Sequence, residues 1–184
     1  FFGNIGRVQG VDNLLSAIKL VNNPRAAFIF IGAGAMVSVL KTYLIENPHL
    51  PVAYVGELSL DKKNFGLAAC DVAIVTLAQG MRGLGVPSKA YFSMAADKPI
   101  LMISEIDSEI SQVIAEEKIG WCCESNNPYK LAKLIDDICS LDELTSLRPR
   151  QVFMNRFTEE IALNKFFDCV RKLLLVSGEV KPNE

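Results

Sequence analysis

The stretch AAFIFI (residues 26–31) is followed at once by the turn Gly32-Ala33-Gly34 and then by a segment with helical spacing up to about Glu46. All six residues of the run are apolar, with no alternation between apolar and polar positions. Such a run is typical of a strand whose two faces are both covered by helices. The stretch therefore predicts a buried strand, a tight turn and a helix, which together form the repeating unit of α/β folds.

The same unit recurs along the chain on both sides of this stretch. Phe2 and its neighbours are expected to form a first strand. Four further apolar runs each precede a segment with helical spacing: residues 51–55 (PVAYV), 71–77 (DVAIVTL), 99–103 (PILMI) and 121–123 (WCC). About six strands that alternate with helices predict a Rossmann-like, doubly wound parallel sheet.

The pattern changes after Ser140, where only helices are expected. The last helix carries one apolar stripe, made of Phe166, Phe167, Val170, Leu173 and Leu174. We expect a single domain over residues 1–176 and a polar tail over 177–184. Because the sequence starts at Phe1 without a methionine, it is expected to be an excerpt of a longer protein.

Composition and charge exclude several classes of protein. About half of the 184 residues are apolar and the formal net charge is −2, with 19 basic and 21 acidic side chains. This balance argues against a nucleic-acid surface, which needs clustered Lys and Arg. The longest uncharged stretch, residues 26–40, is shorter than the roughly 20 residues that span a bilayer. We therefore expect no nucleic-acid partner and no transmembrane segment.

The cysteines and the single histidine indicate neither a metal site nor a disulfide framework. The five cysteines form no CxxC pair and are odd in number, and His49 is the only histidine. We therefore expect no bound metal and no disulfide. Reduced thiols are the rule in the cytosol, so a cytoplasmic location is expected.

The loop after the fourth expected strand holds the strongest candidate for a ligand site. It reads AQGMRGLGV (residues 78–86) and leads into Pro87-Ser88-Lys89. Proline suits the first position of a helix, and the free amides, the hydroxyl, the ammonium and the helix dipole would then face one point. That combination favours a phosphate or diphosphate. The alternative is a good helix start with a solvated lysine, and the spacing leaves both open.

Two other glycine-rich turns are weaker candidates for a ligand site. The turn at residues 32–37 (GAGAMV) is an incomplete dinucleotide fingerprint. Glu57 lies 23 residues beyond Gly34, close to the spacing of about 20 expected for the acidic residue of such a site, so the hypothesis of NAD binding stays open. A tight turn whose glycines relieve steric conflict is favoured instead. The first loop, residues 3–10 (GNIGRVQG), carries Arg7, which would meet an anion or lie exposed in a flexible turn. No catalytic nucleophile can be named.

Several segments together resemble the C-terminal domain of the GT-B glycosyltransferases, within the retaining family called glycosyl transferases group 1. The resemblance covers residues 2–15 (FGNIGRVQGVDNLL), 29–34 (IFIGAG), 55–58 (VGEL), 86–101 (VPSKAYFSMAADKPIL) and 108–121. The segment 86–101 resembles the PSK-containing helix of bacterial enzymes that build capsule, O-antigen and exopolysaccharide.

The resemblance implies one half of a two-domain enzyme. This chain would bind the nucleotide-sugar donor, most often a UDP-sugar, and a domain before Phe1 would orient a growing glycan or a lipid-linked acceptor. The resemblance also implies that transfer needs no metal. No cofactor is expected either, since the nucleotide-sugar is a substrate. The full-length enzyme would be cytoplasmic, with peripheral attachment to the inner membrane as an option.

The resemblance also implies site residues. Lys89, Ser88 and the amides around Val86 would meet the diphosphate, with Asn4, Gly6 and Arg7 on its other side. Gly56, Glu57 and Leu58 would meet the nucleobase, mostly through their backbone.

The chain departs from the family pattern at four positions. Many relatives carry an Arg and a Lys in the first loop, where this chain has Asn4 and Gln9. Many carry two glutamates in an EX7E motif, where this chain has Leu84 and Phe92. Three alternatives therefore stay beside the glycosyltransferase: an NAD-binding oxidoreductase domain, half of a sugar-nucleotide epimerase, and a non-catalytic, degenerate module.

Overall fold

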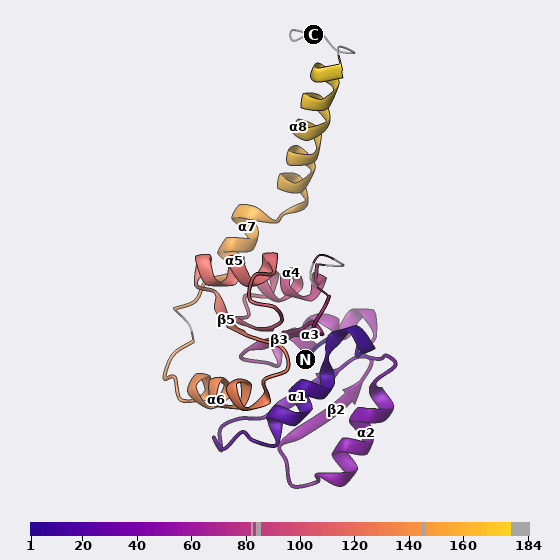
Figure 1. The fold of residues 1–184 in the computed structure, drawn as a ribbon, viewed down its shortest axis with the longest axis vertical. Coiled ribbons are helices and arrows are strands. Elements are labelled where there is room, and N and C mark those ends of the chain that lie inside the picture. Colours follow the sequence, from indigo (N-terminus) through magenta and orange to yellow (C-terminus); the bar gives the residue numbers. More distant parts are fainter. Residues whose placement is uncertain (82, 84–85, 145, 178–184) are drawn as a thin grey trace.

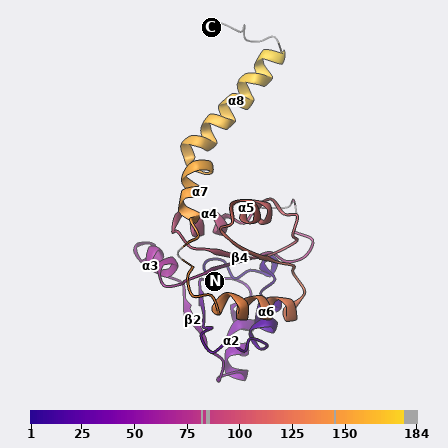
Figure 2. The same cartoon turned by 90° about the vertical axis from the view of Figure 1, so that its left-hand side faces the viewer.

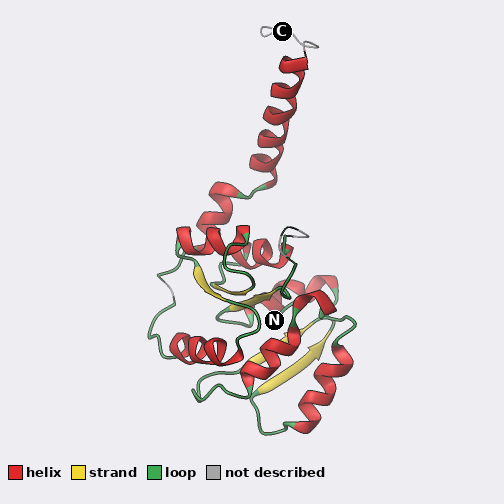
Figure 3. Cartoon of the chain, viewed as in Figure 1, coloured by secondary structure: helices red, strands yellow, loops and turns green. Residues whose placement is uncertain are grey.

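The computed structural model describes residues 1–81, 83, 86–144 and 146–177 as alternating helices and strands (Figures 1 and 3). The strands are β1 (Phe28–Ile31), β2 (Val52–Gly56), β3 (Ala73–Thr76), β4 (Ile100–Ile103) and β5 (Gly120–Cys123). The α-helices are α1 (Val11–Ile18), α2 (Val37–Glu46), α3 (Lys63–Ala68), α4 (Ser88–Ala95), α5 (Glu109–Glu117), α6 (Pro128–Cys139), α7 (Pro149–Arg156) and α8 (Glu159–Ser177). Two 3-10 turns, η1 (Arg7–Gln9) and η2 (Leu60–Lys62), complete the described elements.

The strands form parallel pairs, as the sequence predicts for an α/β fold. β1 pairs with β2, and β3, β4 and β5 form a three-stranded sheet in that order. Each connection between parallel neighbours runs through a helix, which is the usual crossover in such sheets. The α/β class is therefore confirmed.

The expected first strand is present as a paired segment and not as a full strand. The N–H groups of Gly3 and Ile5 donate to the carbonyls of Ile31 and Ala33, at 2.8 Å each. Among the described residues the segment is a single parallel bridge between Phe2 and Ile31. Within the part of the chain that the structure describes there are five strands in two sheets plus this bridge, where the sequence predicts about six strands in one sheet.

The central strand β4 shows why the apolar runs lack alternation. All four of its residues are buried. Ile100 and Met102 belong to a core cluster with residues of α4 and α5, whereas Leu101 and Ile103 belong to a second cluster with residues of α1 and α6. Successive side chains of a strand point to opposite faces, so helices cover both faces of this sheet. Burying each such side chain stabilises the fold by about 1.5–3 kcal/mol.

The last helix lies apart from this core. Figures 1 and 2 show α8 extending away from the sheets beyond α7. Phe166, Phe167 and Leu173 of its apolar stripe are exposed, at 61%, 58% and 70%. The division into a domain over 1–176 and a tail stays a prediction, and residues 178–184 lie outside the described part of the chain.

Candidate donor site

Two loops from distant parts of the sequence meet at the carboxyl edge of the strands. One follows the N-terminal segment and the other follows β3. The N–H of Ala78 donates to the carbonyl of Val8 at 2.9 Å. Gly10 permits this approach, because a Cβ on it would lie 3.2 Å from Cα of Ala78 and its φ is +59°. Ligands of doubly wound sheets bind at such a meeting of loops outside the strand ends.

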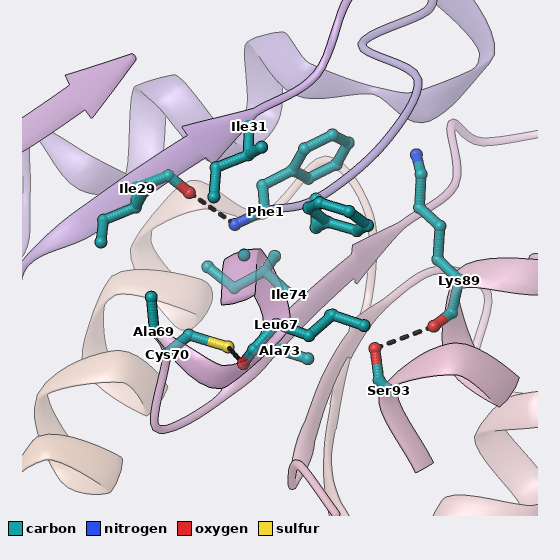
Figure 4. A pocket seen from close by; sticks show the side chains of 12 residues that line it. Phe1, Ile29, Ile31, Leu67, Ala69, Cys70, Ala73, Ile74, Lys89 and Ser93 are labelled. Atoms are coloured by element: carbon teal, nitrogen blue, oxygen red, sulfur yellow. Dashed lines mark hydrogen bonds between the residues drawn. The ribbon is translucent and has the colours of Figure 1, made fainter. Parts of the chain in front are cut away.

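Lys89 crosses from α4 into the first loop. Its Nζ donates to the backbone carbonyl of Asn4 at 2.8 Å and to Oε1 of Gln9 at 2.7 Å. The same nitrogen lies 4.3 Å from the centroid of the Phe1 ring. Figure 4 shows Lys89 beside Phe1. The backbone carbonyl of Lys89 accepts a hydrogen bond from the Ser93 hydroxyl. The first loop and α4 are therefore joined through one ammonium group.

The surroundings of Lys89 leave its charge uncompensated by these partners. The carbonyl of Asn4 and the amide of Gln9 are both neutral acceptors. Burial lowers the pKa of Lys89 from 10.5 to about 8, because a half-buried cation loses part of its hydration. An anion beside Lys89 would restore the lost stabilisation of the charged form.

The N-terminus of α4 adds a second source of positive potential. Pro87 is its N-cap, and no side chain caps the helix. This corrects the prediction that Pro87 is the first helical residue; Ser88 takes that place. Ser88 and Val86 are exposed next to this end of α4. Unpaired first-turn amides and the helix dipole both attract anions.

The first-loop candidates contribute in different ways. Asn4 reaches Lys89 through its backbone, whereas its side chain lies over two glycines: a Cβ on Gly6 would be 2.9 Å from its Nδ2, and one on Gly34 would be 2.6 Å from its Oδ1. Arg7 is exposed in η1. The structure thus brings Asn4, Gly6 and Lys89 together and leaves Arg7 at the surface of the same loop.

The three residues predicted for the nucleobase lie at the end of β2, one strand further along the same edge: Gly56 is the last residue of the strand, and Glu57 and Leu58 follow it. Gly56 has φ +88°, and a Cβ on it would meet no atom within 4 Å. Glu57 is exposed, and Leu58 packs toward α3, where its Cδ1 would lie 3.0 Å from a Cβ on Gly66. The strand β1 separates this loop from the N-terminal segment. The assignment of these residues to a nucleobase stays a prediction.

The Gly32-Ala33-Gly34 turn is filled by backbone of the first loop. A Cβ on Gly32 would lie 1.9 Å from the carbonyl oxygen of Gly3, and one on Gly34 would lie 2.4 Å from that of Ile5. The Ile5 carbonyl also accepts the N–H of Met36, at the start of α2. The glycines are thus needed for chain packing, as the favoured tight-turn interpretation predicts.

Sequence reasoning did not select Gln9 and Phe1 as site residues. Gln9 appeared only as a departure from the family pattern, and its contact with Lys89 spans 80 positions of the sequence. Of the two EX7E positions, Phe92 is 63% exposed on α4, and Leu84 lies outside the described residues. Within the described ranges, no three His, Cys, Asp or Glu side chains gather as metal ligands.

Comparison with known proteins places this chain in a family. The model of the family "Glycosyl transferases group 1" matches residues 1–151. The probable glycosyltransferase WbjE of Pseudomonas aeruginosa is 58% identical over 176 residues, which cover 95% of this chain and 44% of WbjE. The chain therefore spans less than half the length of that relative.

Solved structures show the same fold. S. aureus TarM, as a mutant in complex with fondaparinux, α-GlcNAc-glycerol and UDP, superposes with a TM-score of 0.72 at 17% identity, over 91% of this chain and 34% of TarM. Anabaena HepE, in complex with UDP and glucose, gives a TM-score of 0.70 at 16% identity, over 93% of this chain and 48% of HepE. The expected Rossmann-like half of a GT-B fold is confirmed. On the family match and the identity to WbjE, the chain belongs to the glycosyl transferases group 1 family.

Proposed function

We propose that this chain is the donor-binding domain of a glycosyltransferase that moves a sugar from a nucleotide-sugar to a growing glycan or a lipid-linked acceptor. Membership of the glycosyl transferases group 1 family supports the reaction class. The name of WbjE supports transfer of a sugar. The resemblance of residues 86–101 to the PSK-containing helix of bacterial enzymes supports a role in capsule, O-antigen or exopolysaccharide synthesis. The acceptor is assigned to the part of a longer protein that this chain does not cover.

The observation that carries the proposal is the Lys89 ammonium beside the uncapped start of α4. When the bond between the sugar's anomeric carbon and the phosphate oxygen breaks, negative charge develops on the leaving diphosphate. A fixed cation and first-turn amides lower the energy of that state more than the energy of the bound donor. We assign Lys89, Ser88 and the backbone at Val86 to this task, with Asn4, Gly6 and Arg7 lining the opposite side.

UDP is the proposed leaving group. TarM and HepE have been solved with UDP. Gly56, Glu57 and Leu58 lie at the carboxyl end of the strand next to β1, where a base could reach their backbone. Lys89 and the helix amides supply positive charge from the chain itself, so we propose transfer without a metal or other cofactor. The nucleotide-sugar is a substrate in this scheme.

Location is part of the same proposal. No helix in the described part of the chain combines the length and apolar character needed to cross a membrane. The five cysteines are unpaired thiols, which is the usual state in the cytosol. We propose a cytoplasmic protein, with peripheral attachment at the inner membrane as an option for the longer enzyme.

An NMR titration of the ¹⁵N-labelled chain with UDP, GDP and NADH tests the proposal. UDP is expected to give saturable amide shifts at the start of α4, in the first loop and at Gly56–Leu58. Shifts with NADH centred on residues 32–37 would replace the proposal with the dinucleotide-binding alternative. A chain that binds none of the three would favour the non-catalytic module.

A further inference from the structure

Gln9 lies in a turn that leaves it little freedom. Its backbone N–H donates to the carbonyl of Gly6 at 3.1 Å and closes η1. The next residue, Gly10, adopts φ +59° and packs against Ala78 of the loop after β3. The backbone that carries the Gln9 side chain is therefore fixed by the same contact that joins the two loops of the site.

The side chain of Gln9 takes up one N–H of Lys89. The Nζ atom donates to Oε1 of Gln9 at 2.7 Å and to the carbonyl of Asn4 at 2.8 Å. An ammonium carries three N–H groups, so these two bonds within the described residues leave the third without a hydrogen-bond acceptor. Because a lysine side chain is long and flexible, two acceptors that fix its end remove a large part of the entropy cost of ligand binding.

Both acceptors are neutral, and this distinguishes Gln9 from an acidic residue of the same size. A carboxylate at this position would make the same contact but would cancel the charge of Lys89. Cys70 lines the same small cavity as Lys89, and burial raises the pKa of its thiol, so this thiol is uncharged at neutral pH. Arg7, on the loop that carries Gln9, adds positive charge.

We propose that Gln9 is a positioning residue, whose neutral amide oxygen holds the Lys89 ammonium in place and leaves its full charge for the diphosphate of the donor. The inference rests on the proposed function, because it takes the diphosphate as the ligand of Lys89. It goes beyond that function in naming the residue that fixes the cation and in explaining why an uncharged side chain stands there.

Two variants separate holding the cation from keeping its charge. Gln9→Glu keeps an acceptor of the same length and adds a negative charge. Gln9→Met keeps the approximate shape and removes the acceptor. Gln151→Glu, an exposed glutamine on α7, is the control for an added charge. Affinities for UDP and for uridine are measured by calorimetry from pH 7 to pH 10, with circular dichroism to verify folding.

We expect Gln9→Glu to weaken UDP binding about tenfold at pH 7 and to leave uridine binding unchanged, since only UDP carries the diphosphate. The carboxylate raises the pKa of Lys89, so the decline of UDP affinity with pH moves to a higher pH than in the wild type. Gln9→Met is expected to weaken UDP binding several-fold, with uridine again unchanged. Gln151→Glu is expected to match the wild type in every measurement.

The inference is overturned if either folded Gln9 variant binds UDP as the wild type does, or loses UDP and uridine binding to the same extent. If Gln9→Glu does not fold, Gln9→Met decides alone by the same criterion. A wild type that binds uridine but gains nothing from the diphosphate overturns the assignment of Lys89 and the role of Gln9 with it. A wild type that gains from the diphosphate, with variants that do not differ, overturns only the role of Gln9.

Discussion

The carbonyl oxygen of Ile5 accepts a hydrogen bond from the backbone N–H of Met36 at 2.9 Å, so the first loop closes the start of α2. In a dinucleotide-binding domain, the corresponding helix start holds a pyrophosphate. Here the chain itself supplies the acceptor. Neither α2 nor α4 has a capping side chain at its start, and α4 differs in carrying Lys89 in its first turn.

Gly32 should tolerate no side chain. Its φ is +139°, and a Cβ would lie 1.9 Å from the carbonyl oxygen of Gly3. We expect Gly32→Ala to lower the free energy of unfolding by more than about 2 kcal/mol, because the N-terminal segment must move away from β1. Gly80→Ala is the matched control, since Gly80 has φ +81° but open space around it; we expect a cost of about 1 kcal/mol. Urea denaturation of both variants tests this, and equal costs would refute the packing explanation.

Lys89→Met should weaken UDP binding by about 1–3 kcal/mol, the range for a hydrogen bond that involves a charged group. Methionine keeps most of the aliphatic length and removes the ammonium. Lys133→Met on the exposed surface of α6 is the control and should bind UDP as the wild type does. Calorimetric titration gives both values. Unchanged UDP affinity in the Lys89 variant would show that the diphosphate binds elsewhere.

UDP affinity should fall as the pH rises above about 8. Burial lowers the pKa of Lys89 in the free protein to about 8, and a bound diphosphate raises that pKa because it favours the charged form. Binding therefore takes up a proton between the two pKa values, and the affinity is lost progressively as the pH rises through this interval. Titrations from pH 7 to pH 10 measure the effect. The Lys89→Met variant should show no such dependence, and a wild type with a flat profile would contradict the prediction.

Ile103 should be among the most sensitive positions of the core. It is 1% exposed at the end of β4, whereas Ile45 on α2 is 79% exposed. We expect Ile103→Ala to cost about 2–5 kcal/mol through lost burial and a cavity. Ile45→Ala should change stability by no more than about 0.5 kcal/mol. Thermal and urea unfolding compare the two, and similar losses would mean that β4 is not the centre of the core.

The α/β class can be predicted from the sequence because each apolar run, and the helical spacing after it, is visible in a few consecutive residues. The run at residues 99–103 became β4, with every residue buried, as expected for a strand covered on both faces. The start of α4 differs from the prediction by one residue, because proline suits both the first helical position and the position before it, and Pro87 is the N-cap. The first strand was expected in full but is a single bridge at Phe2.

The candidate site was predicted only in part. Lys89 and Asn4 were both named, and the structure joins them, but through the Asn4 backbone, which no side-chain pattern reveals. The bond between Gln9 and Lys89 spans 80 residues and depends on how two loops meet. Such contacts follow from the topology of the sheet. A glutamine in a glycine-rich loop carries no local signal of the cation that it holds.

Successive side chains of β4 pack on opposite faces of the sheet, and this arrangement also affects how the fold unfolds. Ile100 and Met102 belong to one core cluster, and Leu101 and Ile103 to the other. One cluster cannot become disordered while β4 stays ordered in the other cluster, because the same four-residue strand contributes side chains to both. The helices on the two faces thereby belong to one cooperative unit, and we expect the sheet β3–β4–β5 to unfold in a single transition with the helices that cover it.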